Sequence, residues 1–141
     1  MRAEVLDVFA GCGSLGFEAL SRGAKSVTFV DNHKASMSSI KVNADRLNVS
    51  GRIQMISRDA VAALSQLSQK KFDLIFIDPP YDKDFIRNTL RQVFDSDILR
   101  PFGWLVLEHS KREEPVVEGE YVKVKEKRFG ATYVTFLYRR S

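Results

Sequence analysis

Short apolar runs alternate with stretches of helical periodicity over residues 1–110, and this alternation constrains the fold more than any other feature. The runs predict strands at residues 4–9, 25–31, 52–57, 72–78 and 103–110. The stretches between them predict helices at 14–23, 33–48, 59–70 and 83–96, with Ser14 capping the first and Leu47 on the apolar side of the second. Strands separated by helices form a parallel sheet with right-handed crossovers, so we expect a doubly wound α/β fold.

The rest of the chain has a different pattern. Residues 121–128 and 132–140 flank Phe-Gly-Ala at 129–131, which predicts an antiparallel hairpin. Lys123, Lys125 and Lys127 are spaced two apart, so we expect them on one face of a strand. Protection of an exposed sheet edge explains these lysines about as well as RNA binding does. No linker or internal repeat is visible, so we expect one domain over residues 1–141.

Composition bounds the class of protein. The chain has 141 residues, 44% of them hydrophobic and 28% charged, as expected of a globular domain. No run approaches the roughly 18 apolar residues that a membrane span needs, and the one cysteine, Cys12, excludes an intrachain disulfide, so we expect a cytoplasmic protein with no membrane partner. His33 and His109 have no metal-ligand partners at recognisable spacing, so no metal is expected. The net charge of +4 is compatible with a nucleic-acid partner without establishing one.

A glycine motif follows the first predicted strand. Gly11, Gly13 and Gly16 match G-x-G-x-x-G and open a predicted helix, and Asp31 ends the next strand, 20 residues beyond Gly11. On spacing alone this is a dinucleotide-binding fingerprint, in which backbone approaches the cofactor and an acidic residue binds its ribose.

Asp7 changes the choice of cofactor. It lies four residues before Gly11, so a pyrophosphate over the loop would meet a like charge, whereas an ammonium and a sulfonium would be attracted. The pattern therefore favours S-adenosyl-L-methionine, with its ribose hydroxyls bound by Asp31. Asp59 opens the helix after the third strand, where it can cap that helix and reach the adenine amino group.

Asp78, Pro79, Pro80 and Tyr81 form a rigid corner after the fourth predicted strand. Ligands of open α/β sheets bind at the carboxyl ends of strands, where the first and fourth strands should be neighbours. An exocyclic amine on a base becomes a better nucleophile when acceptors hold its two hydrogens. The Asp78 carboxylate and the Pro79 carbonyl offer such acceptors, the prolines add no competing N–H, and Tyr81 can stack on the base.

At these residues the chain resembles the class I S-adenosylmethionine-dependent methyltransferases, and among them the bacterial RsmD-like family. The resemblance rests on LDVFAGCGSLGFEALSRGAKSVTFVD at 6–31, FIDPPYD at 76–82 and KRFGATYVTFLYRR at 127–140. It implies methylation of a guanine N2 amine in 16S ribosomal RNA, within a small-subunit particle, and a seven-strand sheet with an antiparallel last strand. It also implies a catalytic role for Asp78, Pro79, Pro80 and Tyr81, and a cofactor-binding role for Asp7, Ala10, Gly11, Gly13, Gly16, Asp31 and Asp59.

The resemblance further implies a segment, partly basic, before the first strand. This sequence begins almost at the glycine motif, so we expect the chain as given to bind cofactor but to methylate RNA poorly. Other functions fit the sequence less well. A DNA adenine-N6 methyltransferase uses the same corner but usually needs a target-recognition segment, and a protein-glutamine methyltransferase typically has asparagine at the position of Asp78. An inactive RNA-binding module is disfavoured by the intact loop and corner, and a dehydrogenase would bind NAD instead.

Overall fold

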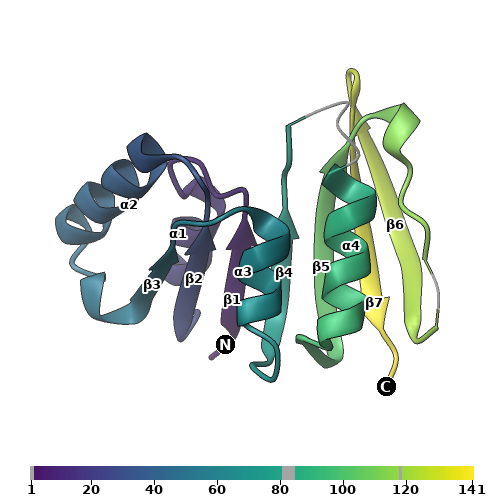
Figure 1. Ribbon diagram of the computed structural model, residues 1–141, viewed down its shortest axis with the longest axis horizontal. Helices are drawn as coiled ribbons and strands as arrows, with labels where there is room; N and C mark the ends of the chain where they lie inside the picture. Colours follow the sequence, from purple (N-terminus) through teal and green to yellow (C-terminus); the bar gives the residue numbers. More distant parts are fainter. Residues whose placement is uncertain (1, 81–84, 118) are drawn as a thin grey trace.

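A computed structural model of the chain describes residues 2–80, 85–117 and 119–141, which form a seven-stranded sheet with helices on both faces (Figure 1). The strands are β1 (Glu4–Val8), β2 (Ser26–Val30), β3 (Ile53–Ile56), β4 (Phe72–Ile77), β5 (Leu99–His109), β6 (Tyr121–Phe129) and β7 (Thr132–Arg139). The helices are α1 (Ser14–Ser21), α2 (Lys34–Arg46), α3 (Ala60–Gln66) and α4 (Phe85–Ser96), with short 3₁₀ helices at Ser50–Arg52 and Lys111–Glu113.

The sheet has the strand order β3-β2-β1-β4-β5-β7-β6. Strands β1 to β5 pair in parallel, whereas β7 is antiparallel to both of its neighbours, β5 and β6. The predicted α/β class, the antiparallel last strand and the pairing of the first and fourth strands are therefore confirmed. Because the strand order reverses between β1 and β4, their carboxyl ends form the switch point at which open sheets bind ligands.

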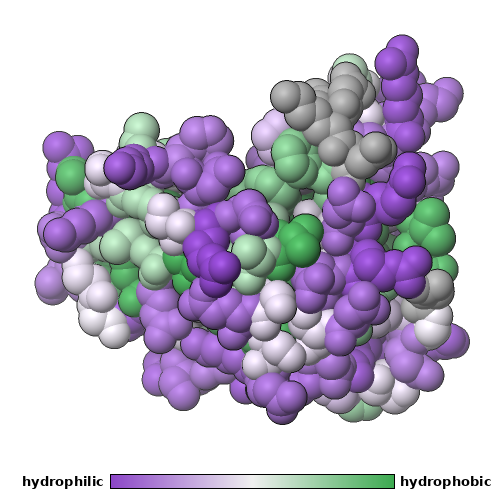
Figure 2. Space-filling view, in the orientation of Figure 1, coloured by the Kyte–Doolittle hydropathy of each residue, from purple (hydrophilic) through white to green (hydrophobic). Residues whose placement is uncertain are grey.

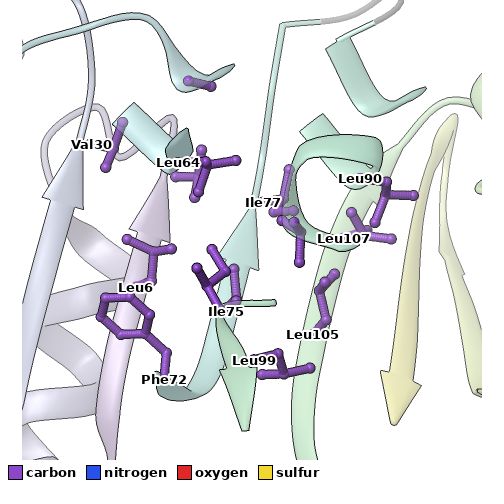
Figure 3. Packing of buried hydrophobic residues seen from close by; sticks show 14 of the residues in the cluster. Leu6, Val30, Leu64, Phe72, Ile75, Ile77, Leu90, Leu99, Leu105 and Leu107 are labelled. Atoms are coloured by element: carbon purple, nitrogen blue, oxygen red, sulfur yellow. The ribbon is translucent and has the colours of Figure 1, made fainter. Parts of the chain in front are cut away.

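Successive side chains of a strand point to opposite faces, and both faces of this sheet are apolar. Leu6, Ile75, Ile77 and Leu107 pack under α3 and α4, where Figure 3 shows Leu64 and Leu90 facing them from the two helices. Val5, Val27 and Phe29 pack under α1 and α2 on the other face. Burial on both faces accounts for the continuous apolar runs of the sequence.

Three local expectations are wrong. Ser14 is the first residue of α1 instead of its cap, because Gly13 takes the cap position with a left-handed φ of 86° and no side chain bonds there. Leu47 lies beyond the end of α2 and is 57% exposed, whereas Ile40 and Ala44 are buried as expected. Strand β5 begins at Leu99, four residues before the predicted start at 103, and takes in a proline and a residue with positive φ, Phe102.

The three lysines of β6 do not share a face. The pairing register shifts between Lys123, opposite Leu137, and Lys125, opposite Phe136, so Val124 is an extra residue in the strand. Such a bulge reverses the alternation of side chains after it. Lys123 accordingly lies on the α4 side with Glu126, at 3.2 Å, while Lys125 and Lys127 point to the opposite side.

Candidate functional site

The glycine loop joins β1 to α1 at the carboxyl edge of the sheet. Gly11 and Gly13 have φ of 59° and 86°, a region that glycine enters without steric penalty. The Gly13 N–H donates to the Ala10 carbonyl at 2.9 Å, and the Ala10 N–H donates to the Val30 carbonyl of β2 at 3.0 Å. The loop is therefore held by one hydrogen bond within it and by one hydrogen bond to the neighbouring strand.

Gly16 allows α1 to lie close to β2. A Cβ atom on Gly16 would stand 2.3 Å from Cε1 of Phe29 and 2.9 Å from Cγ1 of Val27. Phe29 is fully buried, so its ring has little freedom to move aside. The third glycine of the motif is thus required by packing between helix and sheet.

Asp7 lies beneath the loop and is only 1% exposed. One carboxyl oxygen accepts a hydrogen bond from the Gly16 N–H at 3.1 Å. Burial raises the pKa of Asp7 from 3.8 to about 7, opposed by the Gly16 bond and reinforced by the charges of Asp78 and Asp31. A buried carboxyl with this pKa favours a nearby cation.

Asp31 follows β2, and its carboxylate accepts hydrogen bonds from the glycine loop and from the residues that follow it. Its Oδ2 accepts from the Gly11 N–H at 2.9 Å, and its Oδ1 accepts from the His33 N–H at 2.9 Å and lies 3.0 Å from His33 Nδ1. Loss of hydration acts to raise the pKa of Asp31, but the bonds from Gly11 and His33 outweigh it and lower the pKa below 3.8. Asp31 therefore carries a full charge and links the glycine loop to the second strand.

Asp59 is the N-cap of α3, as predicted. Its Oδ1 accepts from the Ala62 N–H at 2.9 Å, and the residue is exposed at the carboxyl edge of the sheet. The second oxygen of the carboxylate has capacity for another donor.

The corner after β4 continues the pairing with β1, because the Asp78 N–H donates to the Val8 carbonyl at 3.4 Å. Pro79 is buried, while Asp78 and Pro80 are exposed. Tyr81, the fourth residue of the predicted corner, lies outside the described residues, and its stacking role stays a prediction.

These acidic residues and the corner meet at one hollow of about 510 Å³. Its lining includes Asp31, Asp59, Asp78, Pro79 and Pro80 of the predicted site, together with Phe9, Val30, Asn32, His33, Arg58, Ala60 and Phe85. Figure 2 shows the mostly hydrophilic face that carries α3 and α4, with the carboxyl edge at its top. The remaining predicted cofactor residues are not among those that line the hollow: Asp7, Ala10, Gly11, Gly13 and Gly16. Gly11 is joined to it, because its N–H donates to Asp31.

Sequence reasoning missed several of the lining groups. Phe9 and Phe85 contact each other edge to face, with ring centroids 5.5 Å apart, and form an aromatic wall. Phe9 has a positive φ of 62°, which sequence gives no means of anticipating. The His33 ring lies 3.0 Å from Asp31 at the hollow, while 74% of its side chain is exposed. Cys12, in the glycine loop, is exposed.

Glu108 is a further acidic group beside the corner. It is half-buried near the end of β5 and follows Leu107, whose partner in the sheet, Ile77, precedes Asp78. Loss of hydration, and after it the neighbouring Glu108 carboxyl, raise the pKa of Asp78.

Within the described residues, no cluster of His, Cys, Asp and Glu side chains is suited to hold a metal ion. None of the helices formed by these residues is both long and apolar enough to cross a membrane.

A sheet of this order, with a glycine loop after β1 and a ligand-sized hollow at the β1–β4 switch point, is the architecture of a class I methyltransferase. Solved structures agree. A Haemophilus influenzae protein provisionally described as a methylase, HI0767, is 31% identical with a TM-score of 0.90, covering 99% of this chain and 88% of that one. A more distant methyltransferase, SMU.776, 15% identical with a TM-score of 0.78 over 96% of this chain and 45% of its own, was solved in complex with SAH, S-adenosylhomocysteine.

The chain belongs to the family described as conserved hypothetical protein 95, which matches residues 1–138 and corresponds to the RsmD-like family that the sequence resembles. A curated relative, ribosomal RNA small subunit methyltransferase D of Haemophilus influenzae, is 34% identical over 131 residues. The match covers 92% of this chain and 68% of that protein. The methyltransferase class and the family predicted from the motifs are thus confirmed.

Proposed function

We propose that this protein uses S-adenosyl-L-methionine to methylate the exocyclic N2 amine of a guanine in small-subunit ribosomal RNA. The observation that carries the proposal is that Asp78 and Pro79 line the same hollow as Asp31 and Asp59. The residues proposed to bind the donor and those proposed to bind the amine therefore border one hollow.

The residues present fit S-adenosyl-L-methionine. The hollow of about 510 Å³ is acidic along Asp31 and Asp59, and the buried Asp7 adds negative potential behind the loop. Asp31 still has lone pairs for the ribose hydroxyls, and Asp59 has a free oxygen for the adenine amino group. When bound, the cofactor supplies an electrophilic methyl group on a sulfonium.

The corner suits an amine acceptor. Asp78 offers a carboxylate oxygen and Pro79 a carbonyl oxygen, and neither proline carries an N–H that would compete for the lone pair. Holding both amine hydrogens directs the nitrogen lone pair outward. The nitrogen forms a bond to the methyl carbon, the carbon–sulfur bond breaks with its electron pair going to sulfur, and one N–H proton leaves the product.

The RNA assignment rests on the relatives. The Haemophilus influenzae protein and others of the family are named as methyltransferases of small-subunit ribosomal RNA, which supports rRNA as the substrate. We expect the reaction to take place on a small-subunit particle in the cytoplasm. The target base must leave its stack to reach the hollow, and Tyr81 is placed by the sequence to receive it.

The test combines cofactor binding with methyl transfer. Calorimetric titration should show binding of S-adenosyl-L-methionine and none of NAD. Asp78→Ala should reduce the single-turnover rate on small-subunit particles by about 10²-fold or more, because general-base positioning of this kind contributes about that much. Its cofactor affinity should change by less than a few-fold, since Asp78 acts on the amine.

Asp95→Ala provides the matched control, because Asp95 is an exposed carboxylate on α4 outside the hollow. Preferred binding of NAD would overturn the cofactor assignment. Full single-turnover activity of Asp78→Ala would overturn the role of the corner, and mapping of the methyl group to another atom would overturn guanine N2.

A further inference from the structure

A groove of about 210 Å³ lies between α4 and residues 112–116, which follow β5 and run along the β6 side of α4 (Figure 1). Ile86, Leu90 and Phe94 of α4 give the groove an apolar lining. Val116, which is 73% exposed, borders it from the opposite side. The proposed methyl transfer uses none of these residues.

Three exposed arginines also line the groove: Arg87 and Arg91 from α4, and Arg112 from the segment opposite. The spacing of four residues puts Arg87 and Arg91 on one face of the helix, about 6 Å apart along its axis. Arg112 makes no ion pair with the residues that the structure describes. Arg87 and Arg91 do interact with other residues, but a guanidinium has five N–H donors, so each can also bind a ligand.

The two acidic residues of the groove are engaged by neighbouring side chains. Ser110 Oγ donates to Glu113 Oε1 at 3.3 Å, and Lys123 Nζ lies 3.5 Å from Glu114 Oε1. Two carboxylates that already have partners do not cancel three arginines, so the groove is positively charged. Like charges four residues apart on a helix repel each other. An anion bound between the arginines would offset this repulsion.

The groove and the hollow meet at the first turn of α4. Phe85 lines the hollow, whereas Ile86 and Arg87, which follow it directly, line the groove. A base that enters the hollow must leave its stack, and contacts to the phosphate backbone set the position of a nucleic acid on a protein. The groove therefore lies where the backbone next to the target base can be held.

We propose that this groove binds the RNA backbone beside the target guanine, with Arg87, Arg91 and Arg112 donating to phosphate oxygens. The proposal rests on the function proposed above and adds a substrate-binding surface to it. A planar guanidinium can donate two parallel hydrogen bonds to one phosphate. The spacing of about 6 Å between the arginines of α4 suits successive phosphates of one strand. A sugar or base of the same strand covers the apolar lining.

Binding to small-subunit ribosomal RNA at several salt concentrations tests the proposal. Arg91→Gln and Arg112→Gln should each reduce the slope of log affinity against log salt by about 0.7–0.9, the value for one phosphate contact. In single-turnover methyl transfer, both variants should need more RNA to reach half of the maximal rate. The maximal rate itself should change by less than about two-fold, because these arginines do not contact the reacting atoms.

Arg46→Gln is the matched control. Arg46 is also an exposed helical arginine, but it lies in the last turn of α2, which packs on the other face of the sheet. Its loss should leave the salt slope unchanged. Cofactor affinity, measured by calorimetry on every variant, establishes that each is folded.

The outcomes separate this proposal from the proposed function. Wild-type slopes in both groove variants, with methyl transfer intact, would overturn the groove alone, as would a wild-type chain that binds no ribosomal RNA at low salt. Weaker binding to protein-loaded particles but not to bare RNA would assign the groove to an acidic segment of a ribosomal protein and so overturn its role in RNA binding. Reduced slopes in variants of a chain that methylates no ribosomal RNA would instead refute the proposed function.

Discussion

At the scale of single residues, Asp7 shows how a residue proposed to bind the cofactor can oppose folding. Its carboxyl is buried with one hydrogen bond, from Gly16, and its pKa of about 7 reflects the lost hydration. The native state keeps the Asp7 proton up to about pH 7, whereas the unfolded chain releases it near 3.8. Between these values the unfolded state binds fewer protons, so the free energy of unfolding falls as pH rises.

We expect Asp7→Asn to stabilise the protein at pH 8 by about 1–4 kcal/mol, from roughly 1.4 kcal/mol per pKa unit. The amide oxygen can still accept from Gly16, while the charge that must be buried is gone. Chemical denaturation at pH 5 and pH 8 measures this, and the difference in stability between the two pH values should shrink in the variant.

The same substitution should weaken binding of the cationic cofactor, which calorimetry measures on the same samples. A variant that is less stable than wild type at pH 8 would show that the Asp7 carboxylate is better satisfied than its single recorded bond indicates.

Sequence spacing was enough to single out Asp31 and Asp59, because both stand at fixed distances from a glycine motif or a helix start. The structure places both at the hollow. Glu108 could not be found in this way. Its relation to Asp78 depends on the register of β4 against β5, which are joined by a helix and an irregular start to β5.

At the scale of elements, the contact between α1 and β2 depends on Gly16. The close approach of helix and strand brings the Gly16 N–H over Asp7 and fixes the loop that precedes α1. Any side chain at this position pushes the helix away from Phe29 and so disturbs the loop as well.

Gly16→Ala should lower the free energy of unfolding by about 1–3 kcal/mol, the usual effect of overpacking a core, and should weaken cofactor binding. Gly51→Ala is the matched control, since a Cβ atom there meets nothing within 4 Å. Urea denaturation of both variants measures the difference. Equal stability of the two would mean that Phe29 moves aside freely and that the packing at Gly16 is not limiting.

Element boundaries were harder to predict than element types. The alternation of apolar runs identified every strand of the parallel part, because burial on both faces leaves a strong signal. The start of β5 was missed because Pro101 and Gly103 weaken the strand pattern there. Leu47 was misplaced because helical periodicity does not reveal that α2 has ended one residue earlier.

At the scale of the whole molecule, the bulge at Val124 distributes the basic side chains of β6 over two surfaces. Lys123 is engaged by Glu114 at 3.5 Å and Glu126 at 3.2 Å, whereas Lys125 and Lys127 lie exposed on the other side. A lysine already paired with carboxylates releases fewer counterions when it meets a phosphate, so the three should contribute unequally to RNA binding.

Each of Lys125→Ala and Lys127→Ala should lower RNA affinity and reduce the slope of log affinity against log salt by roughly 0.7–0.9, the value for one phosphate contact. Lys123→Ala is the control and should change the slope by less. Binding to small-subunit particles at several salt concentrations measures this. Slopes equal to wild type in the first two variants would assign these lysines to protection of the sheet edge.

The overall architecture was predictable because strand–helix alternation leaves few topologies open, and the antiparallel last strand followed from the family resemblance. The bulge was not predictable, because Lys-Val-Lys-Glu-Lys reads as regular alternation in sequence and only the pairing with β7 reveals the extra residue.

The interleaved order β5-β7-β6 has a consequence for a nascent chain leaving the ribosome. β6 is synthesised before β7 but pairs with β7 alone, so it has nowhere to dock until residues 132–139 have emerged. Until then β5 is an open edge, able to pair with the wrong strand. The addition of β7 therefore completes this side of the sheet in one late step. A premature stop after residue 131 would remove β7 and leave β6 without a partner, so the sheet would lose two strands rather than one.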